Sequence, residues 1–313
     1  MIHLHYMSTR ENKPMGWGIV TQQGAELWDA EPVFKGDSVS LRDKLMLFFY
    51  PKKFLLYRYI ERDIQSKQKM GHKYRILDVG CGTGAAVIDM KKLFGKQVEV
   101  VGIDVVHLQV DIAKKRLQKY GVWAQIDWFD GAHMSFQNDS FDAVYTSDVL
   151  GHVEDVETWL YEIHRVLKPG GVLALFAESA LGDHAYIRNY LMKRGLNTDP
   201  HKQFHISLFS KDRLRSMLQA AGFDIKAMYT TVWATFFVHP DEMYASFQEH
   251  GGFFMLRHLN AALHWIKKKT HPYSTAAAEL YSLLEMLTVG RWVESQGYII
   301  LARKEKVSRL RRL

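Results

Sequence analysis

Short apolar runs alternate with amphipathic stretches between Arg75 and Phe176, and this alternation is the clearest pattern in the chain. Apolar residues at three- and four-residue spacing predict helices after the first, second and fourth of these runs, the last two over about 107–119 and 157–167. Strands followed by helices in this rhythm predict an α/β fold with an open, doubly wound, mostly parallel sheet. The runs that predict its strands span residues 76–79, 98–104, 124–130, 141–147 and 172–177.

Two further strands are predicted near the C-terminus, over 223–229 and 297–303, and we expect the last to run antiparallel. Segments that do not fit the alternation surround these strands, and we expect them to form helical lid insertions. Residues 180–210 form one such interruption within the core. The predicted organisation is a helical cap over 1–74, a core over 75–232, an aromatic-rich helical insertion over 233–290, a last core strand over 291–303 and a basic tail over 304–313.

Composition and charge narrow the function classes. A single cysteine, Cys81, excludes a disulfide framework and a zinc site built on several thiolates. The net charge of +7 comes from two segments: residues 41–75 hold ten Lys/Arg against three Asp/Glu, and residues 303–313 hold six against one. The rest of the chain is mildly acidic, which opposes a nucleic-acid-binding body and makes a nucleic-acid partner unexpected.

The basic segment 41–75 has two open interpretations. Its cations are interleaved with large apolar residues such as Leu45, Phe48 and Phe49, a mixture that suits weak attachment to an anionic membrane. Alternatively, the apolar residues pack beneath the lid and leave ordinary solvated lysines outside, which is the interpretation we favour. With no signal-peptide pattern and no long apolar run, we expect a cytoplasmic protein, peripheral at the membrane if the first interpretation holds.

A glycine cluster follows the first predicted strand, in the sequence DVGCGTG over Asp78–Gly84. Glycines let the backbone turn sharply from strand into helix and let a ligand approach the main chain. The cluster alone also fits a dinucleotide pattern, and an acidic residue about twenty positions later, Asp104, suits either ligand. Asp78 favours a ligand that carries an ammonium, because a carboxylate there would repel a pyrophosphate. A second acidic residue, Asp130, ends the third predicted strand and also favours that ligand over a dinucleotide.

Six motifs in sequence order extend this cluster over residues 76–178. On them the chain resembles the class I S-adenosylmethionine (SAM) methyltransferases, most closely the methyltransferase type 11 group that includes ubiquinone and menaquinone biosynthesis enzymes. The resemblance implies a Rossmann-like fold and transfer of a methyl group from SAM, with S-adenosylhomocysteine as the product. The motifs are ILDVGCGTG (76–84), GID (102–104), DGAHMSF (130–136), SFDAV (140–144), VLGHV (149–153) and RVLKPGG (165–171).

The resemblance also implies residue roles. The glycines would wrap the methionine part of SAM, Asp78 would serve its amino group, and Asp104 would accept from both ribose hydroxyls. Asp130 would accept from the adenine amino group, with the Gly131 N–H offered to the ring, and Ser147 would contact the methionine end through its backbone. The cofactor-binding residues implied are thus Asp78, Gly80, Cys81, Gly82, Gly84, Asp104, Val105, Asp130, Gly131 and Ser147.

Candidate residues for the acceptor side are fewer. His152 follows the fourth predicted strand and is the candidate catalytic residue, as a base or an acceptor-positioning group; an ordinary loop histidine is the alternative. His201 and His205 have helical i,i+4 spacing, but with no carboxylate at ligand spacing we expect no metal site. The aromatic residues of 233–265 either line an acceptor pocket or form the core of the insertion.

Together these features predict a SAM-dependent methyltransferase that acts on a small apolar or aromatic acceptor. An RNA methyltransferase is one alternative, although residues 146–149 read TSDV where an Asn-Pro-Pro-Tyr-type motif would be expected. A non-catalytic SAM-binding protein is another, because a cofactor site does not prove an acceptor site. A nicotinamide oxidoreductase shares the glycines but not the later motifs.

Overall fold

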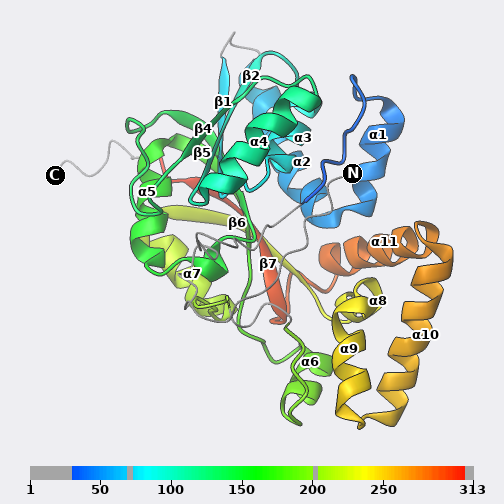
Figure 1. Ribbon diagram of the computed structural model, residues 1–313. Helices are drawn as coiled ribbons and strands as arrows, with labels where there is room; N and C mark the ends of the chain where they lie inside the picture. The colour runs from blue at the N-terminus through cyan, green and yellow to red at the C-terminus, as the bar shows by residue number, and fades with distance from the viewer. Residues whose placement is uncertain (1–29, 69–72, 200–203, 307–313) are drawn as a thin grey trace.

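The structure, a computed structural model, describes residues 30–68, 73–199 and 204–306. Its centre is a seven-stranded sheet in the order β3-β2-β1-β4-β5-β7-β6 (Figure 1). The first five strands of the sheet run parallel, and β7 is antiparallel to both of its neighbours, which confirms the predicted mostly parallel sheet with an antiparallel C-terminal strand. The strands are β1 (Tyr74–Val79), β2 (Val98–Asp104), β3 (Gln125–Trp128), β4 (Phe141–Ser147), β5 (Leu167–Ala177), β6 (Phe223–Thr231) and β7 (Gln296–Lys304).

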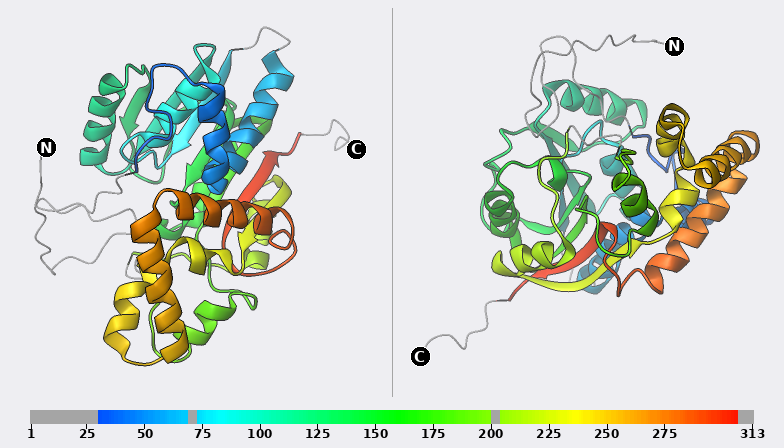
Figure 2. Two further views of the ribbon diagram at one scale, coloured as in Figure 1. Left: turned by 90° about the vertical axis from the view of Figure 1, so that its right-hand side faces the viewer. Right: turned by 90° about the horizontal axis from the view of Figure 1, so that it is seen from below.

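Helices cover both faces of the sheet, which explains why the central strands are apolar throughout (Figures 1 and 2). On one face, α5 (Val156–Val166) and α7 (Lys211–Ala220) pack with Trp159 and Leu218 fully buried. On the other face lie α2 (Pro51–Gln68), α3 (Ala85–Phe94) and α4 (His107–Lys119). The sheet is thereby a rigid platform whose carboxyl-terminal edge carries the connecting loops.

The end of α5 differs in one detail from the sequence prediction. The predicted helix over 157–167 and the predicted strand over 172–177 leave Lys168-Pro169-Gly170-Gly171 between them, yet these residues lie within β5. Leu167 pairs with Phe141 and Val172 pairs with Ala143, so the strand contains extra residues between these two pairs. Such an irregularity accommodates a proline that cannot donate a ladder hydrogen bond.

The segment before β1 is part of the main core. It forms α1 (Leu41–Met46), the 3₁₀ helix η1 (Leu47–Phe49) and α2, whose Leu56 and Ile60 are fully buried. Asp89, buried on α3, holds this segment in place. Its carboxylate accepts hydrogen bonds from the backbone N–H groups of Val33 (2.7 Å) and Phe34 (3.0 Å), and it pairs with Lys53 Nζ at 2.8 Å.

Four helices fill the insertion between β6 and β7: α8 (Ala234–Val238), α9 (Pro240–His250), α10 (Phe254–Thr270) and α11 (Tyr273–Leu287). They extend to one side of the sheet together with α6 (Tyr186–Met192), as Figures 1 and 2 show. The insertion has its own small apolar cluster, in which Leu191, Phe236 and Phe247 are buried, while α11 packs against η1. None of the described helices is both long enough and apolar enough to span a membrane.

Candidate active site

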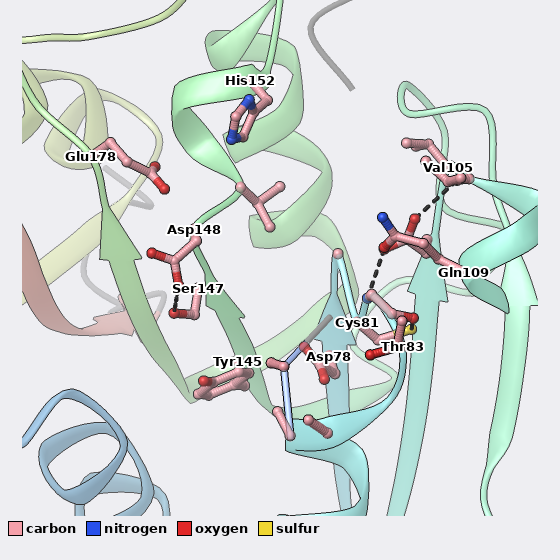
Figure 3. Close-up of a pocket in the computed structure, with 18 of the residues that line it drawn as sticks. Asp78, Cys81, Thr83, Val105, Gln109, Tyr145, Ser147, Asp148, His152 and Glu178 are labelled. Carbon is pink, nitrogen blue, oxygen red and sulfur yellow. Dashed lines mark hydrogen bonds between the residues drawn. The ribbon is translucent and has the colours of Figure 1, made fainter. Parts of the chain in front are cut away.

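A cavity of about 530 Å³ opens at the carboxyl-terminal ends of β1, β2 and β4 (Figure 3). In the sheet order the chain proceeds outward from β1 through β2 to β3 on one side, and from β4 to β5 on the other. The cavity therefore lies where the strand order reverses, which is the usual ligand site of open α/β sheets. Its lining includes eight of the predicted residues: Asp78, Gly80, Cys81, Gly82, Asp104, Val105, Ser147 and His152.

The loop after β1 needs glycine at particular positions. Gly80 has a φ of +75°, and a Cβ built there would lie 2.3 Å from Cγ2 of Val149. Gly84 has a φ of +85° at the N-cap of α3, and a Cβ there would meet Ala113 and Leu117 of α4 at 3.1 Å. Backbone sterics and close packing therefore both select glycine, and the loop stays narrow enough to border a ligand.

Two buried carboxylates stand beside this loop. Asp104 accepts hydrogen bonds from the backbone N–H groups of Gly82 (2.8 Å) and Val106 (2.9 Å). Within the described part of the chain, Oδ2 of Asp78 is buried with no hydrogen-bond partner. Burial, reinforced by the charge of Asp104, raises the pKa of Asp78 well above its usual range, so this carboxyl would be stabilised by a cationic partner.

Three predicted cofactor residues do not line the cavity. Gly84 shapes the loop from behind, as described above. Asp130 is exposed, and its carboxylate accepts from the backbone N–H groups of Ala132 (2.9 Å) and His133 (2.8 Å). Gly131 is buried with a φ of +87°. From the same loop the cavity is lined by Phe129.

The other end of the cavity is rich in ionisable groups. Lys52 at the start of α2 forms an ion pair with Asp148, which directly follows β4 and has a φ of +61°. Figure 3 shows Glu178 and His152 on the same side of the cavity as Asp148. Burial, and secondarily the charge of Asp148, raises the pKa of Glu178 to about 7. A strained backbone and a shifted carboxyl are both typical of functional sites.

His152 lies at this end, in the 3₁₀ helix η2 (Leu150–His152) that follows β4. Its Nδ1 is 3.0 Å from the carbonyl oxygen of Phe204, and its ring centroid is 5.0 Å from that of His205. His205 lies in an irregular segment, and His201, its predicted partner at helical spacing, is outside the described residues. The structure instead brings His205 to His152 and Glu178.

A second cavity, of about 390 Å³, adjoins the first. It mixes apolar side chains such as Tyr229 and Met286 with ionisable ones such as Arg188 and Glu279. The residues that line both cavities, and so mark their junction, are Lys52, Lys53, Glu178, His205 and Glu242.

The aromatic residues of the insertion line neither of these cavities. Phe236 is buried in the apolar cluster of the insertion, whereas Trp233 and Phe237 are about two-fifths exposed at 42% and 39%. The insertion reaches the second cavity through smaller and polar side chains instead. These are Thr235, Val238, His239, Glu242, Glu279, Ser282 and Met286.

Sequence reasoning missed the charged groups at the junction. Lys52 was grouped with a basic segment, since nothing local indicates that α2 begins at the cavity. Glu178 carried a usable signal: it directly follows the wholly apolar end of β5, at the edge where the other strands place their ligand-binding loops. Its position at a strand end, like those of Asp78 and Asp104, therefore makes Glu178 a candidate ligand-binding residue.

Comparisons with known proteins agree with the motifs. Residues 77–175 match the methyltransferase domain family, Methyltransf_11. The chain is 31% identical over 162 residues to a demethylmenaquinone methyltransferase of Lactobacillus johnsonii, an alignment that covers 47% of this chain and 66% of that protein. It is 32% identical over 154 residues to a sterol 24-C-methyltransferase of Gibberella zeae, covering 48% of this chain and 40% of that protein. The chain thus matches less than two thirds of the length of either relative.

Solved structures resemble the chain more distantly. One is the phosphoethanolamine N-methyltransferase 2 of Haemonchus contortus in complex with S-adenosyl-L-methionine, at 18% sequence identity and a TM-score of 0.46. That likeness covers 86% of this chain and 60% of the other.

Proposed function

Residues 77–175 form a domain of the methyltransferase family, and from this we propose that the protein transfers a methyl group from SAM to a small-molecule acceptor. The observation that carries the proposal is Oδ2 of Asp78, which is buried in the cavity at the strand switch point and has no hydrogen-bond partner among the described residues. A buried carboxylate oxygen without a partner is costly, and a ligand ammonium would relieve that cost. The relatives named for demethylmenaquinone and sterol methylation are in keeping with a small-molecule acceptor.

The residues around the first cavity fit SAM better than a dinucleotide. Asp78 would hold the amino group, and each carboxylate oxygen of Asp104 can accept one further hydrogen bond beyond its backbone partner, which suits two ribose hydroxyls. The Asp78 carboxylate would repel a pyrophosphate, which opposes a nicotinamide cofactor, whereas Asp104 suits the ribose of either ligand. Asp130 and Gly131 would reach an adenine only from beyond the cavity lining.

The second cavity supports an acceptor with an apolar body and a polar group. Its wall contains Phe176 and Tyr229 as well as Glu279 and Arg188, so it can hold both parts of such a molecule. We propose that the polar group lies at the junction of the two cavities, beside His152, Glu178 and His205. An aromatic or aliphatic acceptor that bears a hydroxyl or an amine fits this description.

SAM, when bound, supplies a methyl group activated by its sulfonium. The chain then has to position the acceptor atom in line with that methyl and exclude water from the junction. An acceptor hydroxyl also has to lose its proton, and His152, at the end of the first cavity, is the candidate to position the acceptor or take up that proton.

Calorimetry with S-adenosylhomocysteine and with NAD tests the cofactor. We expect binding of the first and none of the second. Asp104→Ala and Asp78→Asn should each weaken binding by about 1.5–3 kcal/mol, the range for hydrogen bonds to charged groups. Asp111→Asn, on the exposed face of α4, is the matched control and should leave affinity unchanged. Binding of NAD without S-adenosylhomocysteine would overturn the proposal.

Methyl-labelled SAM incubated with a cell extract tests the acceptor class. We expect the label in the small-molecule or lipid fraction. Label in the RNA fraction would favour an RNA methyltransferase. Tight cofactor binding with label in no fraction would favour a non-catalytic SAM-binding protein.

A further inference from the structure

We propose that His152, Glu178 and His205 form a binding site for a divalent transition-metal ion. Their candidate ligand atoms, one from each side chain, all lie within 4.8 Å of one another. The three residues come from η2, the end of β5 and the irregular segment after position 203, so only the fold brings them together. Two imidazoles and one carboxylate are a ligand set that proteins use for catalytic zinc and for non-haem iron.

Hydrogen bonds orient both histidines for this role. Nδ1 of His205 lies 2.9 Å from Oδ2 of Asp199, and Nδ1 of His152 lies 3.0 Å from the carbonyl oxygen of Phe204. A proton donated from Nδ1 places the imidazole lone pair on Nε2, which is then the coordinating atom. With the ion bound, His152 would therefore hold the metal and would not take up the acceptor proton. Ligand histidines in metalloproteins almost always make such a bond to a carboxylate or a carbonyl.

The backbone around Gly151 holds the three side chains close together. The carbonyl oxygen of Gly151 accepts hydrogen bonds from the N–H groups of Ile206 (2.8 Å) and Ser207 (3.0 Å). These two bonds hold the irregular segment that carries His205 against η2. The N–H of Gly151 donates to Oε2 of Glu178 at 3.2 Å. A Cβ at Gly151 would lie 3.0 Å from Oε2 of Glu178 and 3.2 Å from Cδ2 of His205, so a larger residue there would displace these side chains by a few tenths of an ångström.

The donor set selects the ion. Nitrogen donors favour zinc, cobalt, nickel or iron(II), whereas Mg²⁺ and Ca²⁺ prefer sites made of oxygen ligands. Tetrahedral ligands at about 2.0–2.2 Å from zinc lie about 3.4 Å apart, so the widest separation allowed here must close by about 1.4 Å on binding.

The position of the site suggests what the ion would do. All three residues line the first cavity, and Glu178 and His205 also line the second, so the open coordination positions face the junction. Water would occupy them until an acceptor oxygen replaced it. Coordination of the acceptor by the ion rests on the proposed function. It specifies an acceptor that binds through a hydroxyl, carboxylate or enolate oxygen. Metal binding itself does not depend on SAM.

The test is titration of the chelator-treated full chain with Co²⁺, followed by its d–d absorption, and with Zn²⁺, followed by calorimetry. We expect one tight equivalent, unaffected by millimolar Mg²⁺. His205→Gln and Glu178→Gln should lose this equivalent. Asp199→Asn, which keeps all three ligands, should weaken binding about 10- to 100-fold, as changes to hydrogen-bonded neighbours of metal ligands do. His258→Gln, an exposed residue on α10, is the control and should bind as the parent does.

Two results would overturn the site: no tight equivalent in the parent chain, or an equivalent that survives in both ligand variants. If a ligand variant loses its cooperative unfolding transition, the metal affinity of Asp199→Asn becomes the deciding measurement. A metal affinity equal to that of the parent chain would also overturn the site. Affinity for S-adenosylhomocysteine, measured on the same samples, separates the two proposals. Metal binding without cofactor binding would contradict only the proposed function. Cofactor binding without metal binding would contradict only the metal site.

Discussion

Glu279 shows how the second cavity constrains single residues. Its carboxyl lies on α11 in the cavity wall, where burial raises its pKa to about 7 despite the nearby charges of Lys267 and Lys52. The unfolded chain releases this proton near the ordinary value of 4.5. The stability that the protonated carboxyl contributes is therefore complete below about pH 4.5 and is lost as the pH rises through about 7.

Replacing this residue should remove that pH dependence. At pH 8 we expect Glu279→Gln to unfold with a free energy about 1–2 kcal/mol above that of the parent, a range discounted for partial exposure. At pH 5 the two should differ little. Urea denaturation at both pH values measures the effect, with Glu249→Gln on the exposed side of α9 as the control. Equal differences at the two pH values would show that the carboxyl does not titrate as described.

Sequence reasoning at this scale succeeded where a residue type has a local cause. Asp78 and Asp104 were found because they end apolar strands beside a glycine turn, and the structure places both at the cavity. Glu178 and Lys52 were missed because their importance comes from neighbours distant in sequence. Lys52 meets Asp148 across 96 positions of chain, and no local pattern indicates such a pair.

Among the elements, the segment before β1 depends most on one buried side chain. Asp89 joins α3 to the backbone at Val33 and Phe34 and to Lys53 of α2. Asp89→Asn keeps the shape of the side chain but removes its charge, and it leaves the Lys53 ammonium without its partner in a partly buried position. We expect a loss of about 3 kcal/mol in the free energy of unfolding, at the lower end of the range for breaking a buried ion pair.

Urea denaturation of the variant tests this expectation. Asp37→Asn makes the same chemical change at an exposed position of the same segment and should stay within about 0.5 kcal/mol of the parent. A similar small effect for Asp89→Asn would mean that apolar packing alone holds the segment.

The insertion allows a second test at the level of elements. Phe236 is 2% exposed within the small cluster formed with α6 and α9, so Phe236→Ala should destabilise the chain by about 3–5 kcal/mol. Phe237→Ala, at a position 39% exposed, should cost less than about 1.5 kcal/mol. Neither should change affinity for S-adenosylhomocysteine, because neither side chain lines the first cavity. Loss of that affinity in Phe237→Ala would show that this exposed aromatic side chain takes part in cofactor binding.

The strand and helix pattern was predictable because each central strand is buried on both faces and each flanking helix on one. The inclusion of Pro169 in β5 was not predictable from the sequence. The irregular pairing of β4 with β5 determines whether a proline there precedes the strand or lies within it. The contact of α11 with η1 was also beyond the sequence, since it joins segments more than 200 residues apart.

On the scale of the whole molecule, most of the described basic residues between positions 41 and 75 are already paired. Lys52, Lys53, Arg58, Lys67, Lys73 and Arg75 form ion pairs with acidic residues of the chain. Among the described residues, α1 combines unpaired cations with exposed apolar side chains: Leu41 is 75% and Leu45 is 53% exposed beside Arg42 and Lys44.

We therefore expect weak binding to anionic vesicles at low salt and none at physiological salt. Two cations near a membrane contribute about 2 kcal/mol together, or about 30-fold in affinity. The double substitution Arg42→Gln, Lys44→Gln should abolish the binding, and Lys114→Gln, Lys115→Gln on α4 should not. Co-sedimentation with anionic and neutral vesicles measures this. Persistence at physiological salt would point to a larger membrane surface, and tight RNA binding would favour the RNA alternative.

The order of strands in the sheet has a consequence for biosynthesis. β7 lies between β5 and β6, yet the ribosome makes it after both, and after the four helices of the insertion. Until residues 296–304 emerge, the nascent chain carries β5 as an unpaired edge and β6 with no strand to pair with. Exposed edges of this kind invite pairing with other chains. Premature termination before Gln296 should consequently yield polypeptides that depend on chaperones and are readily degraded.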